Sequence, residues 1–104
     1  MSFDIEAVLN DMLAAVNNSV DADWDDIKGY AKQILENEKD TIKDLAEQRL
    51  RGELTEEELK SELEDEKDTV EAEFKAVQVM TEAMAQKAAN AAIDVIFKAI
   101  KAAV

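Results

Sequence analysis

The sequence predicts an all-helical protein, and its composition supports that prediction in three ways. The chain contains no proline and only two glycines, so the residues that most often interrupt helices are nearly absent. Alanine, glutamate, lysine and leucine are abundant, and all four have high helix propensity. Aromatic residues, which favour strands, make up only 5% of the chain. Few signals for strands or tight turns are therefore left.

The length and the overall polarity indicate one folded domain over residues 1–104. A hydrophobic content of 47% is normal for a globular chain and disfavours wholesale disorder, although 36% of the residues are charged. The N-terminus turns acidic at once, whereas a signal peptide starts with basic residues, and no window contains 18 consecutive apolar residues. We therefore expect a cytoplasmic protein without a signal peptide or a transmembrane segment.

The first predicted helix spans residues 3–18, where apolar residues recur at helical spacing. They form one stripe along the helix: Ile5, Val8, Leu9, Met12, Leu13 and Val16. The segment NNSVDAD that follows is rich in residues that favour helix caps over helix interiors. The first helix is therefore expected to end near residue 18.

The second predicted helix spans residues 23–51. Asp25 and Asp26 suit the positive N-terminal end of its dipole, and Gly52 supplies the left-handed residue that commonly follows a helix. Its buried face is expected to consist of apolar residues at helical spacing: Trp24, Ile27, Ala31, Ile34, Leu35, Ile42, Leu45 and Leu50.

The third predicted helix begins at Thr55 and spans residues 55–104. Thr55 and Glu58 form a capping box, in which each side chain accepts a hydrogen bond from the other residue's backbone amide. No proline or glycine follows, so one helix of about 75 Å is expected, unless it bends near residues 80–86. A compact chain of this length has a radius of gyration of only about 13 Å. We therefore expect an elongated antiparallel hairpin or bundle, with the second helix against the N-terminal half of the third and the first helix against the C-terminal half.

Charge is strongly segregated along the third predicted helix. Residues 53–73 contain eleven acidic residues and two lysines, while residues 74–104 carry a net charge of +2. The first of these segments is expected to be exposed to solvent. Its candidate recognition face consists of Glu57, Glu62, Glu64, Asp65 and Asp68. A solvated helix face without a specific partner is the simpler interpretation of such a charge run.

The segment 88–104 is rich in alanine and apolar around most of its circumference. Its four polar residues, Asn90, Asp94, Lys98 and Lys101, fall on one narrow stripe. Because the first helix offers only one apolar stripe to cover this segment, a second copy of the chain is expected to bury the rest, most simply in a homodimer with coiled-coil-like contacts. The predicted oligomer core consists of Met84, Ala88, Ile93, Val95, Ile96, Phe97 and Ile100. Contact of this segment with a membrane surface is disfavoured, since two lysines without a tryptophan make a weak interfacial anchor.

Several kinds of chemistry lack their usual residues. The chain contains no histidine and no cysteine, which removes the commonest general base, the commonest nitrogen ligand for metals and all thiolate sites. The segment from Asp21 to Asp26 has aspartates at alternate positions, but Asp26 and Lys32 stand where a calcium loop requires glycine and glutamate. No catalytic residue, metal ligand or cofactor is predicted, and the protein is not expected to be an enzyme.

The net charge of −13 also disfavours direct binding to nucleic acid, because the phosphates would be repelled. The function predicted from the sequence is therefore a non-catalytic oligomerisation or protein-interaction module with an unidentified protein partner. An acidic inhibitor or decoy, which would imitate DNA and occupy a basic groove on another protein, is the alternative.

Overall fold

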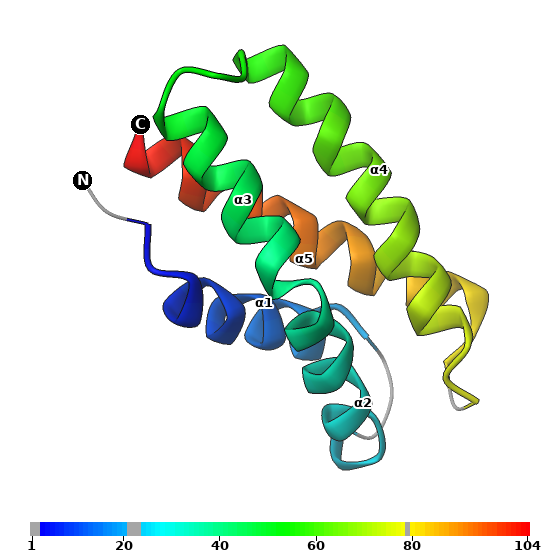
Figure 1. Cartoon of the computed structure of the whole chain (residues 1–104). Helices are drawn as coiled ribbons and strands as arrows, with labels where there is room; N and C mark the ends of the chain where they lie inside the picture. Colours follow the sequence, from blue (N-terminus) through cyan, green and yellow to red (C-terminus); the bar gives the residue numbers. More distant parts are fainter. Residues whose placement is uncertain (1–2, 21–23, 79) are drawn as a thin grey trace.

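A computed structural model describes residues 3–20, 24–78 and 80–104. It contains five helices, α1 (Ile5–Ser19), α2 (Trp24–Asn37), α3 (Lys39–Leu50), α4 (Glu56–Lys75) and α5 (Glu82–Ala103), and no strand within the described residues (Figure 1). The all-helical prediction is therefore confirmed. The prediction of three helices in an elongated hairpin is wrong, because the radius of gyration is 13.3 Å and the longest dimension is 40 Å.

The first unpredicted break divides residues 23–51 into α2 and α3 at Glu38. Glu38 has φ −97° and ψ 1°, and its amide donates to the carbonyl of Leu35, three residues back, which tightens the chain locally. A straight helix over 23–51 would be about 42 Å long, longer than the whole molecule. The bend lets α2 pack on α1 while α3 reaches α5. The expected start at Asp23, and Asp21 with it, lie outside the described residues.

The second unpredicted break lies between α4 and α5 and rules out one long third helix. Helix α4 ends at Lys75, and α5 starts after Thr81, whose hydroxyl oxygen accepts a hydrogen bond of 3.1 Å from the Met84 amide. The connecting residues Val77 and Met80 are both buried in the core. Burial of these two side chains favours a turn here although neither proline nor glycine is present.

Helix α5 lies in the middle of the fold and is covered by its own chain. Figure 1 shows α5 behind α3, with α1 and α4 on either side, and α5 has its most extensive contacts with α1 and α4. The expected packing of the N-terminal helix against the C-terminal one is therefore observed. The buried side of α5 consists of seven residues: Ala85, Ala88, Ala89, Ala92, Ile93, Ile96 and Ile100. Helices α1, α3 and α4 all contribute to covering this helix, so the same chain provides cover that was expected from a second copy.

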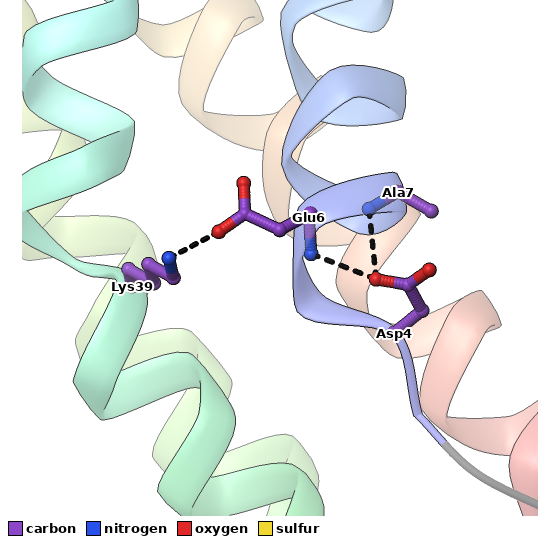
Figure 2. Close-up of polar contacts among 4 residues, drawn as sticks. All are labelled: Asp4, Glu6, Ala7 and Lys39. Atoms are coloured by element: carbon purple, nitrogen blue, oxygen red, sulfur yellow. Dashed lines mark hydrogen bonds and ion pairs between the residues drawn. The ribbon is translucent and has the colours of Figure 1, made fainter.

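The N-terminal end of α1 is held by two polar contacts. The Asp4 carboxylate accepts hydrogen bonds from the amides of Glu6 and Ala7, at 3.1 and 3.3 Å, which caps the helix (Figure 2). The Glu6 carboxylate forms an ion pair with Lys39 at the start of α3, and this contact raises the pKa of Lys39. The ion pair therefore links α1 to the α2–α3 bend across the surface.

None of the helices in the described part of the chain is both long and apolar enough to span a membrane.

Candidate functional site

The turn between α3 and α4 contains the three residues singled out as cap and turn residues in the sequence. Gly52 has a φ of 78°, in the region that L-residues rarely adopt. The Glu58 amide donates to the Thr55 hydroxyl oxygen at 3.1 Å, and the Thr55 amide donates to the Glu58 carboxylate at 2.9 Å. Both contacts satisfy backbone amides at the start of α4, so the turn positions the acidic face described next.

The acidic face lies on the outer side of α4. All five of its residues are exposed: Glu57, Glu62, Glu64, Asp65 and Asp68. At 3.6 residues per turn, Glu57, Glu64 and Asp68 fall within an arc of about 40° and span about 17 Å along the helix. The stripe of Leu59, Leu63 and Val70, which faces the core, lies on the other side of α4. Among the described residues, one ion pair involves this face, the 3.1 Å contact between Lys67 and Glu64.

The residues expected to form an oligomer core lie in α5. Ala88, Ile93, Ile96 and Ile100 are buried inside the single chain. The other three, Met84, Val95 and Phe97, are partly buried and pack against the same core. The apolar surface that motivated a second copy is therefore small in the folded chain.

A shallow groove of about 270 Å³ separates α4 from α5. Its lining includes the apolar residues Leu63, Ile93 and Phe97, and the Lys60 ammonium lies 5.5 Å from the centroid of the Phe97 ring. The rim carries both signs of charge, and the complete lining is Lys60, Leu63, Glu64, Lys67, Asn90, Ile93, Asp94 and Phe97. Because the charges balance, this groove favours no charged ligand.

The structure also contains a carboxyl cluster that we define as Glu38, Glu66 and Glu73, between the α2–α3 bend and α4. Glu66 is only 7% exposed, and its Oε1 atom has no hydrogen-bond partner within the described residues. Burial, the hydrogen-bonding contact with Glu38 and the charges of Glu38 and Glu73 raise the pKa of Glu66 to about 8. Burial and Glu38 also raise the pKa of Glu73 to about 7. The cluster therefore holds acid groups that resist ionisation at neutral pH.

The sequence contains a signal for this cluster in the spacing of its apolar residues. Helix α4 buries Leu59, Leu63, Glu66, Val70 and Phe74, at spacings of four, three, four and four, so Glu66 occupies a position on the apolar stripe. The α2–α3 segment follows the same rule. Its stripe continues through Glu38 at spacings of three or four: Ile27, Ala31, Ile34, Glu38, Ile42 and Leu45. An acidic residue at a stripe position of each of two helices predicts two carboxyls facing each other across a buried contact.

A cleft of about 460 Å³ opens beside the carboxyl cluster and shares Glu73 with it. Tyr30 on α2 is 58% exposed and forms one wall. Ile34 on α2 and Val77 in the α4–α5 turn contribute apolar surface, and the remaining lining residues are Gln33, Ala76 and Gln78. The cleft thus combines an exposed aromatic ring, an aliphatic wall and a carboxyl group.

Neither the acidic face nor the carboxyl cluster has the arrangement of a metal site. Within residues 3–20, 24–78 and 80–104, no group of three or more acidic side chains could hold a metal ion. Comparison with known proteins assigns no relationship, since no protein-family model, no curated protein and no solved structure matches the chain. Any function must therefore be argued from the surfaces of this chain.

Proposed function

We propose that the protein is a non-catalytic protein-interaction module whose acidic face on α4 binds a basic surface of a partner protein. The observation that carries this proposal is the exposed stripe of Glu57, Glu64 and Asp68 on the outer side of a helix whose opposite side is buried. A rigid row of carboxylates about 17 Å long complements a groove lined by lysine or arginine.

Two properties of α4 support recognition at this face. The helix is anchored by five buried residues and by its capping box, so the carboxylates keep their spacing without rearrangement on binding. The surrounding net charge of −13 accelerates the approach of a basic partner and discourages acidic ones. The same features suit a decoy that competes with nucleic acid for a basic groove.

Self-association through α5 has less support than recognition through α4. The stripe that suggested a dimer is largely covered by α1 and α4 of the same chain. The α4 face, in contrast, is exposed along its whole length.

The proposal is tested by reversing charge on the acidic face and measuring what the protein captures. The variant carries Glu57→Lys, Glu64→Lys and Asp68→Lys, and wild-type protein and variant are each immobilised and exposed to lysate of the source cells. Partners are identified and quantified by mass spectrometry. Because all three positions are exposed, circular dichroism is expected to show unchanged helicity. We expect a basic protein that wild type captures to be lost from the variant.

The matched control carries Asp11→Lys, Glu36→Lys and Asp44→Lys, at exposed positions on α1, α2 and α3. Each reversal adds two positive charges, so both triple variants carry a net charge of −7 instead of −13. The control should retain the partner. Equal capture by all three proteins would show that α4 is not the recognition surface, and equal loss from both variants would show that only net charge matters.

A further inference from the structure

We propose that the cleft between α2 and the C-terminal end of α4, lined by Tyr30, Ile34, Glu73 and Val77, binds an arginine side chain of a partner protein. This cleft is separate from the acidic face on the outer side of α4. Its test therefore does not depend on the outcome of the charge-reversal experiment.

The walls of the cleft suit the shape of an arginine. Only the outer edges of Ile34 and Val77 reach the cleft, since both are mostly buried, and the methylene groups of the side chain would lie mainly against the exposed Tyr30 ring. The volume of about 460 Å³ leaves room for the guanidinium. The Tyr30 ring is 58% exposed and lines the cleft, so its face is accessible to a ligand. A guanidinium stacks on such a ring more readily than an ammonium does.

The lining residues of the cleft include one carboxyl, that of Glu73, and no basic side chain. Glu73 lines the cleft and contacts Glu38, which in turn contacts Glu66. No ion pair found in the described parts of the chain includes any of these three carboxyls. The Oε1 atom of Glu66 is also buried without a partner. A guanidinium that entered beside Glu73 would favour the ionised form of that carboxyl and supply up to five hydrogen-bond donors.

The geometry favours an organic cation over a metal ion. The three carboxyls do not converge on one point in the manner of metal ligands. A planar guanidinium requires no such convergence, because its donors point outward in a fork that two separate carboxyls can share. The nearby apolar surface of Ile34 and Val77 would also gain nothing from a hydrated metal ion.

The pKa values of the cluster agree with this assignment. In the free protein the pKa of Glu73 is raised to about 7, chiefly by burial and by Glu38. A bound guanidinium would favour the ionised carboxylate and lower that pKa. Binding should therefore be tighter near pH 8 than near pH 6.

The experiment titrates isotopically labelled protein with the capped tripeptide acetyl-Gly-Arg-Gly-amide at about pH 8 and follows backbone amide shifts by NMR. The control peptide contains citrulline, which has nearly the same shape as arginine but no charge. We expect saturable shifts at Tyr30, Ile34, Glu73 and Val77 with the arginine peptide. The dissociation constant should lie in the millimolar range, as expected for a ligand with one anchoring side chain.

Two variants assign the binding to the cleft. Glu73→Gln should weaken binding about tenfold, because one charge-assisted contact is lost. Tyr30→Ala should also weaken it, and because Tyr30 is exposed the fold should survive. The matched control is Glu64→Gln, which removes a carboxylate from the outer acidic face and should leave the dissociation constant unchanged.

Three results would overturn the proposal. One is an equal effect of the citrulline peptide on the cleft amides. Another is binding of the arginine peptide at the Glu57 and Asp68 amides that persists unchanged in Glu73→Gln. The third is the absence of cleft shifts at about 20 mM peptide, well above the dissociation constant expected for such a ligand.

Discussion

Replacement of Glu66 by glutamine should stabilise the protein at neutral and alkaline pH. Glu66 sits at a buried stripe position of α4 against the carboxyl of Glu38, and these surroundings raise its pKa from 4.5 to about 8. Glutamine has the same shape but cannot ionise, and its amide can donate a hydrogen bond to Glu38. The variant therefore keeps the packing and removes the cost of a buried charge.

The magnitude follows from the difference between the folded and unfolded pKa of this one group. Between pH 4.5 and pH 8 the folded state binds the Glu66 proton more tightly than the unfolded state does, so the free energy of unfolding falls as pH rises. One proton contributes about 1.4 kcal/mol per pH unit in the middle of this window. From pH 5 to pH 7 the expected loss is about 2.5 kcal/mol, a large part of the 5–15 kcal/mol that is typical of a domain. Glu73, whose pKa is raised to about 7, acts in the same direction.

Urea denaturation followed by circular dichroism at pH 5, 6, 7 and 8 measures this effect. Wild type should lose stability steadily over the series, whereas Glu66→Gln should lose about 3.5 kcal/mol less between pH 5 and pH 8 and become the more stable protein by pH 8. The control Glu62→Gln removes an exposed carboxylate one turn away, so it should keep the wild-type slope. The reasoning is refuted if Glu66→Gln is less stable than wild type at pH 8, or if its pH dependence equals that of the control.

Three further predictions concern the fold and can be measured by the same urea method. Ile96→Ala should cost about 2–5 kcal/mol, because Ile96 is fully buried in α5; a cost below about 1 kcal/mol would mean that α5 is not enclosed by its own chain. Thr81→Ala should cost about 1 kcal/mol through loss of the cap of α5, and a neutral result would show that this cap does not help to start the helix. Gly29→Ala should stabilise the protein by about 0.5–1 kcal/mol, because Gly29 lies inside α2 with open space around it. Gly52→Ala should destabilise the protein by a similar amount, because Gly52 has a φ of 78°. If both substitutions changed the stability in the same direction, the assigned conformation of Gly52 would be contradicted.

Local signals predicted the features of the fold that depend on local chemistry. The helical class follows from composition, and the reversal between α3 and α4 depends on Gly52, Thr55 and Glu58, whose hydrogen bonds connect residues close in sequence. The packing of α1 along α5 could be expected from their complementary apolar stripes. Each of these features is encoded within a few residues or in one helical period.

The two additional breaks could not be predicted in the same way. Neither Glu38 nor the segment between α4 and α5 contains proline or glycine, so a search for helix breakers passes over both. The breaks become favourable only when distant helices are present to bury what the bends expose. In the second break, Val77 and Met80 are buried against the core. Tertiary packing, and not helix propensity, therefore determines where these two helices end.

The carboxyl cluster has a signal in the sequence, but the many acidic residues around Glu66 make that signal difficult to recognise. Glu66 lies in a dense acidic segment, and its stripe position distinguishes it from its exposed neighbours Glu64 and Asp65. The partner carboxyl, Glu38, is 28 residues away in the chain. Only the antiparallel approach of the two segments shows that the two acids meet.

Glu66 is buried against Glu38, and no ion pair within the described residues includes it. The most direct test is a pH titration of the side-chain carboxyl carbon of Glu66 by NMR, assigned by comparison with Glu66→Gln. We predict a midpoint near pH 8, about 3.5 units above the ordinary value for glutamate. A midpoint below about pH 5 would show that the carboxyl is solvated or paired with a cation, and would contradict the buried position of Glu66.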